Sequence, residues 1–297
     1  MTRKRAKEME NAAVRGSMSQ GRLIWLRFQK NRLAVIGLIG IIIMMLICFT
    51  SPLYISWDQV IHQDLLLETV EPCKEFPFGT DQFGRDLFAR LLRGGVYSLS
   101  SGFIVMFGAL ILGLIFGSIA GYFGGKTDTI IMRLMDVFMA VPNLLMAMTL
   151  IVVFGQGIGS LWLSLALSSF PGIARTVRSS IMTTRSAEYV DAAHIYGSST
   201  AKILIKHILP NCIGPVVISA TLMLGSTILC IAGMGFLGIG IASPTPEWGT
   251  ILSEVKDYIR FYPYLGVIPG SAIALSVIFI NFMGDGLRDA LDPRMKK

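Results

Sequence analysis

The stretch that comes closest to a catalytic motif is AGYFGGKT, residues 120–127, which fits the permissive phosphate-loop pattern of Ala or Gly, four residues, Gly, Lys and Ser or Thr. In a phosphate loop, a buried strand leads into the glycines and the next helix N-terminus faces the phosphates. Here a long apolar segment precedes the glycines, and no strand-and-helix alternation follows. We therefore expect no nucleotide or other cofactor on this chain, and no ATP hydrolysis by it.

Cysteine and histidine do not indicate a metal centre. The four cysteines and three histidines are scattered without metal-ligand spacing. Of the cysteines, Cys73 alone falls in a segment that we expect outside the cell, so we predict neither a metal site nor a structural disulfide.

Composition assigns the chain to the membrane. Of its 297 residues, 53% are hydrophobic and 15% charged, whereas soluble domains have about 25% charged residues. A membrane-spanning helix needs about 20 apolar residues. The sequence therefore predicts an all-α integral membrane protein with six transmembrane helices, at residues 33–51, 98–121, 134–154, 158–177, 212–240 and 265–284.

The distribution of the positive charge predicts the topology. Most of the 26 Lys and Arg residues lie before the first span, between alternate spans or after the last span. Basic segments stay in the cytoplasm, so we expect both termini there. This topology explains the net charge of +7 without nucleic acid, and makes membrane lipid the expected surroundings of the chain.

The spans divide the chain into a basic tail with an interfacial helix, a first span, an outer loop, a core and a short second tail. In the outer loop, Asp81 and Asp86 are interpreted as turn and cap residues of a short helix over 86–93, in preference to a ligand site. The five segments span 1–32, 33–51, 52–97, 98–285 and 286–297. The core includes an inner loop, 183–210, and a second outer loop, 242–264, which we interpret as a partly re-entrant hairpin.

Glycine and proline indicate how the spans pack. Small residues at four-residue intervals let membrane helices approach closely, and the second span carries Gly113, Gly117 and Gly121. Prolines inside spans remove helical hydrogen bonds, which bundled membrane helices tolerate when neighbours satisfy the freed groups. We expect this for Pro142, Pro171 and Pro269.

The inner loop 183–210 is longer than a simple return into the membrane requires. Ser186 is expected to cap a helix that ends at Tyr196, and Gly197 to take the left-handed conformation that ends it. Ser198 or Ser199 would cap a second helix, which Pro210 would stop. Such an amphipathic pair either rests on lipid headgroups or fits a groove on a soluble partner.

Spacing favours the second alternative. DAAHIYG, nine residues and HILP closely resemble the EAA loop of ABC importer permeases, although Asp191 replaces Glu and His207 replaces Ile. Further blocks are similar to the C-type subunit of the dipeptide, oligopeptide and nickel permease family: FGTDQFGRDLFARLLRGG, AGYFGGKTD, GFLGIGIASPTPEWGTIL and NFMGDGLRDALDP.

The resemblance implies a type I ABC importer (MetI-like) permease fold in a bacterial cytoplasmic membrane. It implies a heterodimer with a B-type permease, two ATP-binding-cassette ATPase subunits and an extracytoplasmic solute-binding protein. Peptides are the first expected cargo, and nickel or another small solute the alternative. The residues expected to couple the chain to an ATPase are Glu188, Asp191, Ala192, Ala193, Tyr196, Gly197, Leu209 and Pro210.

Polar residues within the spans are candidates for the wall of a pathway. Ser and Thr in membrane helices often only bond their own backbone, so a structural role stays open for each. An ion-coupled secondary transporter, the alternative from another class, would bury ionisable residues near the bilayer midplane, and the spans show none there. The candidates are Asn143, Ser168, Ser169, Ser219, Thr227 and Asn281.

Overall fold

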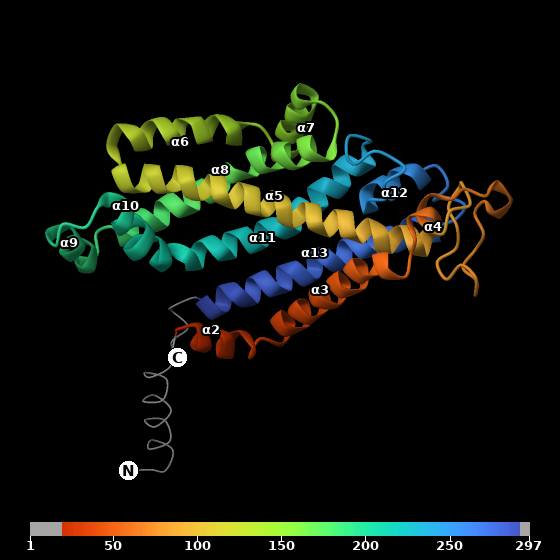
Figure 1. Ribbon diagram of the computed structural model, residues 1–297, viewed down its shortest axis with the longest axis horizontal. Helices are drawn as coiled ribbons and strands as arrows, with labels where there is room; N and C mark the ends of the chain where they lie inside the picture. Colours follow the sequence, from red (N-terminus) through yellow and green to blue (C-terminus); the bar gives the residue numbers. More distant parts are fainter. Residues whose placement is uncertain (1–19, 292–297) are drawn as a thin grey trace, which may run out of the picture.

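Long helices laid side by side form the body of the protein. The computed structural model describes residues 20–291, and within them it contains helices and no strand, apart from one isolated β-bridge between Thr80 and Asp86. The predicted all-α fold is confirmed. The helices that run along the long axis in Figure 1 are α3 (Arg32–Thr50), α5 (Leu87–Phe123), α8 (Ile158–Thr184), α11 (Leu209–Phe236) and α13 (Tyr264–Leu291).

Shorter helices gather toward the two ends of this body. Figure 1 shows α9, α10 and α2 toward the end where α13 finishes, and α4 and α12 at the opposite end. We call these the α9 end and the α12 end. The shorter elements are α2 (Gln20–Phe28), η1 (Ser51–Leu53), α4 (Trp57–Ile61), η2 (Leu65–Leu67), α6 (Gly125–Ala140), α7 (Asn143–Phe154), α9 (Glu188–Ile195), α10 (Thr200–Lys202), η3 (Ile203–Ile208) and α12 (Trp248–Val255).

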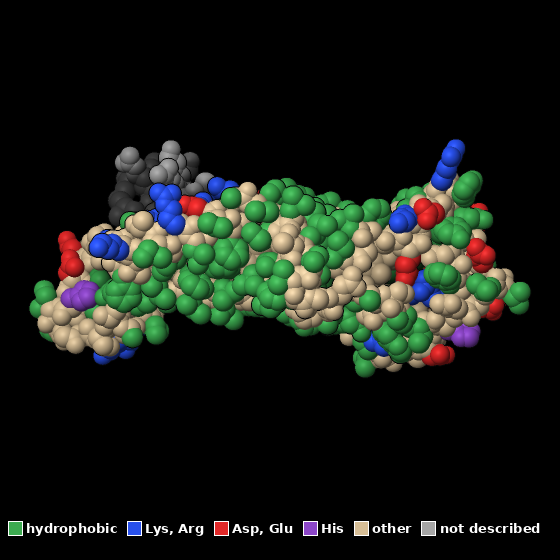
Figure 2. Space-filling model, turned by 90° about the horizontal axis from the view of Figure 1, so that it is seen from above, with side chains coloured by type: hydrophobic (Ala, Val, Ile, Leu, Met, Phe, Trp, Pro, Cys, Tyr) green, Lys and Arg blue, Asp and Glu red, His purple; other side chains and the backbone are tan. Residues whose placement is uncertain are grey.

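The surface has the pattern of a membrane protein. Hydrophobic side chains cover the middle of the face seen in Figure 2, and charged side chains gather toward its two ends. Among the described residues, four helices are long and apolar enough to cross a membrane, or five if α6 and α7 are counted as one bent span. The predicted fourth span corresponds to α8, which is long but interrupted by polar residues, so six spans were too many by this measure.

The predicted third span, 134–154, is broken. Val141 is extended, with φ −99° and ψ 133°, and Pro142 precedes α7, so that α6 and α7 meet at 94°. Proline has no N–H to donate and disfavours helical backbone in the residue before it. Pro142 therefore ends a helix, whereas Pro171 and Pro269 lie inside continuous helices as expected.

The short helix predicted over 86–93 is the first part of α5. Asp86 is its N-cap, as predicted, and accepts a hydrogen bond from the N–H of Phe88 at 2.9 Å. Gly94 and Gly95 do not end the helix; they lie where α3 and α12 pack closely against it. A Cβ on Gly95 would lie 2.3 Å from the Cys48 sulfur, so this glycine makes room for α3.

Glycines bring α5 against α8, the most extensive helix pair of the fold. A Cβ on Gly113 would lie 2.5 Å from the Ile173 side chain, and one on Gly117 would lie 2.5 Å from the Ala174 carbonyl oxygen. Gly121 faces the backbone of Arg178. The close approach predicted from the glycine spacing is confirmed, and α8 is the partner.

The N-terminal segment is helical where an interfacial helix was predicted. Helix α2 ends at Phe28, which is buried, and Arg27 donates to the Ala290 carbonyl over 3.5 Å. Trp25 and Leu26 are exposed. The contact ties this helix to the end of α13 and leaves an apolar face outside the bundle. The predicted basic tail before residue 20 and the last residues of the predicted second tail, 292–297, lie outside the described residues.

Replacing Gly117 with Ala tests the α5–α8 contact. The added methyl group would meet backbone, and overpacking of this kind costs about 1–3 kcal/mol, so we expect the thermal unfolding midpoint of the purified protein to fall by several degrees. Gly270→Ala is the control, since a Cβ there meets nothing within 4 Å. Equal midpoints for the two variants would contradict the assigned contact.

Candidate functional site

Helix α9 forms the tip of the molecule at the α9 end. It starts at Glu188, and Glu188 and Asp191 lie in its first turn as predicted. Ser186 is not its cap: the Ser186 hydroxyl donates to the Thr183 carbonyl at 3.2 Å, and Ala187 holds the cap position without a side-chain bond. The acidic first turn therefore supplies the favourable interaction with the helix dipole.

Gly197 turns the chain at the end of α9. Its φ is +73°, in the left-handed region that favours glycine. The Gly197 N–H donates to the His194 carbonyl at 2.9 Å, and the Ser198 N–H donates to the Ala193 carbonyl at 3.1 Å. These two bonds are those of a Schellman motif, and they confirm the predicted glycine corner.

The second helix does not stop at Pro210. From Thr200 the chain continues through the π-helical turn η3 directly into α11. The Leu209 N–H donates to the Leu204 carbonyl, five residues back. In a regular α-helix, the Pro210 ring would clash with the carbonyl of Lys206, and the wider π-turn lets the proline sit at the start of α11. The prediction of a helix halted by Pro210 was wrong.

One side of α9 is anchored and the other is free. Val190 and Ala193 are buried against the core that includes η3. On the exposed side, 85% of Ile195 and 88% of Tyr196 are accessible. Figure 1 shows α9 projecting beyond the ends of the long helices. The tip thus presents large apolar side chains on a fixed support, which is the form of a docking element.

The residues predicted to couple to an ATPase fall in two places. Those of α9 and its corner lie together at the tip, and most are exposed; Ala193 faces the core. Leu209 and Pro210 lie at the start of α11, beyond η3. They join the tip to a long helix and are not part of its exposed side.

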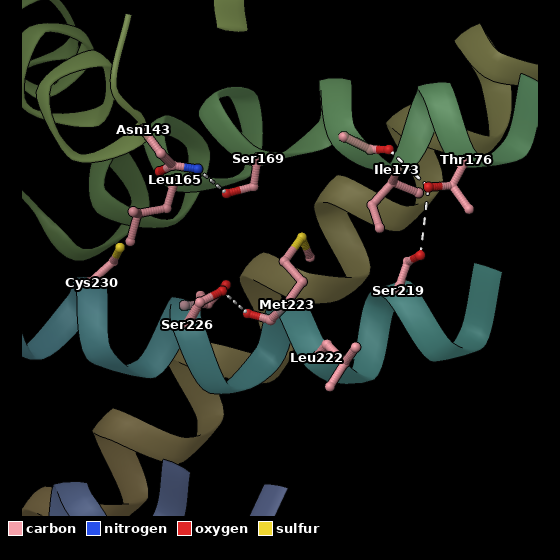
Figure 3. A pocket seen from close by; sticks show the side chains of 12 residues that line it. Asn143, Leu165, Ser169, Ile173, Thr176, Ser219, Leu222, Met223, Ser226 and Cys230 are labelled. Carbon is pink, nitrogen blue, oxygen red and sulfur yellow. Dashed lines mark hydrogen bonds between the residues drawn. The ribbon is translucent and has the colours of Figure 1, made fainter. Parts of the chain in front are cut away.

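Two adjoining hollows run between α8 and α11. The first, of about 460 Å³, is lined from both helices and by Asn143 of α7; the second, of about 600 Å³, lies toward the α9 end, and the two share Thr176. Figure 3 shows side chains of α8 and α11 facing each other across the first hollow. Together the hollows form a groove along the axis of the bundle.

The break before α7 places Asn143 on this groove. Its side-chain amide donates to the Ser169 hydroxyl at 3.0 Å and accepts from the Ser168 hydroxyl at 3.0 Å. Because Pro142 redirects the chain, the first residue of α7 reaches α8. Three polar candidates are thereby held together, although a loop separates Asn143 from the other two in the sequence.

The structure brings most of the predicted pathway residues together. Asn143, Ser169, Ser219 and Thr227 line the first hollow, and Ser168 lies behind them. Asn281 does not line either hollow. Its side chain lies between α13 and α11, where a Cβ on Gly225 would be 3.0 Å from its amide oxygen.

Sequence reasoning missed other hydroxyl groups of the groove. Thr176 accepts a hydrogen bond from Ser219 across the hollow at 3.5 Å, and it also donates to the Gly172 carbonyl of its own helix. The recurrence of Ser and Thr every three or four residues along α8 was the available signal. Others on the groove are Ser179, Ser180, Thr183, Thr184 and Ser226.

Ion pairs hold α6 against α8 beside the groove. Arg178 makes a two-point contact with Asp128, and Arg175 pairs with Asp136. Arg133 lies 3.6 Å from the same Asp136 carboxylate. Arg133 and Asp136 thus form a local pair within α6, and α8 adds a second arginine to it.

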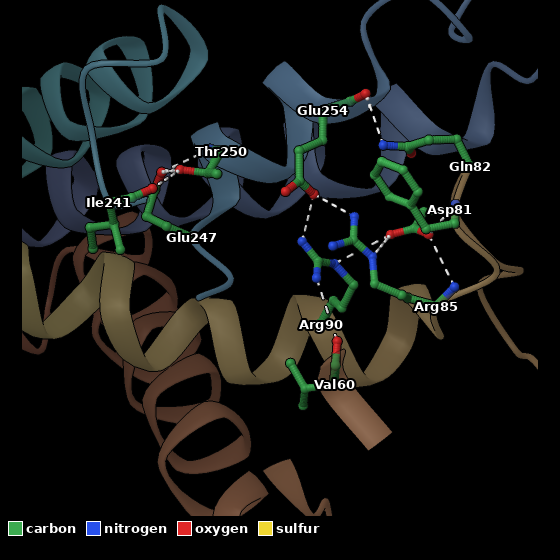
Figure 4. Close-up of polar contacts among 10 residues, drawn as sticks. Val60, Asp81, Gln82, Arg85, Arg90, Ile241, Glu247, Thr250 and Glu254 are labelled. Atoms are coloured by element: carbon green, nitrogen blue, oxygen red, sulfur yellow. Dashed lines mark hydrogen bonds and ion pairs between the residues drawn. The ribbon is translucent and has the colours of Figure 1, made fainter. Parts of the chain in front are cut away.

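A buried network of four charged side chains lies at the α12 end (Figure 4). Arg85 contacts Asp81 and Glu254 at 2.6 Å each, and Arg90 contacts Glu254 at 2.7 Å. Asp81 is the turn residue that was predicted, since the N–H groups of Phe83 and Arg85 donate to it. Its ion pair with Arg85 was missed, and so was Glu254, which contacts both arginines but lies far away in the sequence.

The network joins the outer loop to α12, which packs inside the bundle. Trp248 is fully buried and donates its indole N–H to the Leu91 carbonyl at 2.9 Å. Glu247 caps α12 and accepts from the Ser98 hydroxyl at 2.8 Å. Complete burial raises the pKa of Glu247, because a charged carboxylate loses its hydration there. The middle of the 242–264 loop is therefore packed into the core, whereas Phe261 near its end is 74% exposed.

These features together define a membrane protein with a polar groove within a helical bundle and an exposed apolar tip at one end. The family model for the inner membrane component of binding-protein-dependent transport systems matches residues 113–297, and the model for the N-terminal transmembrane domain of oligopeptide transport permease C matches residues 19–68. The chain belongs to this family of inner membrane transport components.

Relatives match over nearly the whole chain. The dipeptide transport system permease protein DppC of Alkalihalophilus pseudofirmus is 39% identical over 280 residues, which cover 94% of this chain and 92% of that protein. The oligopeptide transport system permease protein OppC of Bacillus subtilis is 36% identical, with 95% and 92% covered. Both are similar to this chain from end to end.

Solved structures agree on the fold. The inward-facing MetNI methionine ABC transporter matches with a TM-score of 0.57 at 21% identity, over 69% of this chain and 98% of that chain. A second crystal form gives a TM-score of 0.56. The predicted type I ABC importer permease fold is confirmed.

Replacing Arg85 with Met tests the buried network. Removing one member leaves Asp81 and Glu254 short of a partner inside the protein, and breaking a buried ion pair costs about 3–5 kcal/mol. We expect a large loss of thermal stability in the purified protein. Arg133→Met, at a side chain 81% exposed, is the control and is expected to change little. Similar midpoints for both variants would show that the network does not stabilise the α12 end.

Proposed function

We propose that the chain is one of two different permease subunits of an ABC importer and that it carries dipeptides or oligopeptides across the cytoplasmic membrane. A B-type permease would face the groove between α8 and α11 and complete the pathway. Two ATPase subunits would bind on the cytoplasmic side, and a solute-binding protein would deliver cargo on the outer side. The exposed tip at α9 is the observation that carries this proposal.

The names of the relatives support peptides as the cargo. The names of the two proteins given above state dipeptide and oligopeptide transport. The groove is consistent with this, because hydroxyl and amide groups from α7, α8 and α11 line it. Such groups can exchange hydrogen bonds with a peptide backbone. Nickel or another small solute is the alternative cargo.

The coupling step follows from the geometry of the tip. An ATPase that binds Tyr196 and Ile195 would hold α9 by its free side, while Val190 and Ala193 fix its other side to the core. Residues 200–236 form one continuous helical rod. Movement of the tip would therefore shift α11, which forms one wall of the groove. The chain would convert the motion of its partners into access for the cargo.

The Gly197→Val variant tests coupling. Valine in the left-handed region costs about 1–3 kcal/mol, so the corner would reshape while the membrane helices stay intact. We expect ATP-driven peptide uptake by the reconstituted complex to fall about tenfold or more, with normal amounts of assembled complex and continued ATP hydrolysis.

Ala201→Val, at an exposed position of α10, is the control and is expected to transport normally. Full uptake by the Gly197 variant would contradict the role of the corner. If uptake by the wild-type complex is assayed with peptides and with Ni²⁺, the solute that is carried decides between the two cargoes.

A further inference from the structure

We propose that Arg175 is a transient binding site for the carboxylate group of the cargo, and that it reaches this group by releasing Asp136. This inference rests on the proposed function, because it assigns a chemical role to one residue of the same groove. It concerns solutes with a free carboxylate, of which peptides are the expected case.

Position is the first argument. Of the described side chains that line the two hollows, Arg175 alone carries a fixed charge, and all other polar groups there are hydroxyls, thiols or the amides of Asn143 and Asn211. Arg175 lines the second hollow next to Thr176, where the two hollows meet. A solute that moves along α8 and α11 therefore has to pass this residue.

Availability is the second argument. The Arg175–Asp136 pair is 44% and 43% exposed, whereas Arg178 and Asp128 are 30% and 14% exposed and make two contacts. Half-exposed ion pairs contribute little to stability, because water competes for both partners. The Arg175 pair can therefore open at little cost, while the Arg178 pair keeps α6 attached to α8.

The third argument is that Asp136 keeps a partner when Arg175 leaves. Arg133 lies 3.6 Å from the second oxygen of its carboxylate. If a cargo carboxylate replaced Asp136 on Arg175, the cargo would pair with Arg175 and Asp136 would still pair with Arg133. A guanidinium group binds carboxylates through two parallel hydrogen bonds, so the exchange trades one carboxylate partner for another of the same kind.

The test uses the reconstituted complex of both permeases, the ATPases and the binding protein. Uptake of a dipeptide with a free C-terminus is compared with uptake of its C-terminal amide, each relative to the wild-type complex. For Arg175→Gln we expect free-acid uptake to fall about tenfold, by analogy with the loss of a charge-assisted hydrogen bond, and amide uptake to stay near the wild-type value. Arg175→Lys keeps the charge and should restore part of the free-acid uptake.

A second variant separates binding from a structural role of the ion pair. Asp136→Asn breaks the pair but leaves Arg175 charged and free, so we expect free-acid uptake to be retained or raised. If the pair only fixes α6, Arg175→Gln and Asp136→Asn will lower the uptake of both peptides alike, and the inference is wrong. Arg178→Gln serves as the control for loss of an α6–α8 contact.

The outcomes also separate this inference from the proposed function. A wild-type complex that imports no peptide overturns both. A wild-type complex that imports peptides, together with an Arg175→Gln complex that imports free acid and amide at wild-type rates, overturns the inference alone.

Discussion

The close contact between α5 and α8 is the constraint on which the rest of the structure depends. Glycine at 113, 117 and 121 lets the two helices approach closely over the C-terminal part of each. Helices in a membrane gain little from burying apolar surface, since lipid is equally apolar, so close packing has to supply the attraction. With its other side against α5, α8 is held with its hydroxyl groups toward α11, and the groove exists because this orientation is fixed.

The two ends of the molecule are built for different tasks. At the α12 end, a buried ionic network and a buried tryptophan join the outer loop, α5 and α12 into one packed unit. At the α9 end, a short helix is held through Val190, Ala193 and His194, while Ile195 and Tyr196 at its end are exposed. A packed α12 end and a tip with a free side are consistent with the coupling role proposed for the α9 end.

Broken helical regularity places the polar groups of the groove. Pro142 interrupts an apolar stretch and delivers Asn143 to Ser168 and Ser169, and the π-turn before Pro210 lets one rod connect the tip to the groove wall. Because proline lacks a backbone N–H and clashes with the preceding turn, each proline disturbs a helix whatever its neighbours. Whether the chain bends sharply, as at Pro142, or continues, as at Pro171, depends on neighbours that hold the two parts.

The sequence by itself determined the membrane class, the family and the glycine corner of α9, because composition, motif spacing and left-handed glycine are properties of contiguous residues. It also placed four of the six polar candidates on the groove that the structure shows. Only the tertiary structure decided that Arg85 and Arg90 meet Glu254, that Arg175 meets Asp136 on the groove, and that Asn281 lies elsewhere. These contacts join residues far apart in the chain, and their partners are set by how helices pack, which no local pattern encodes.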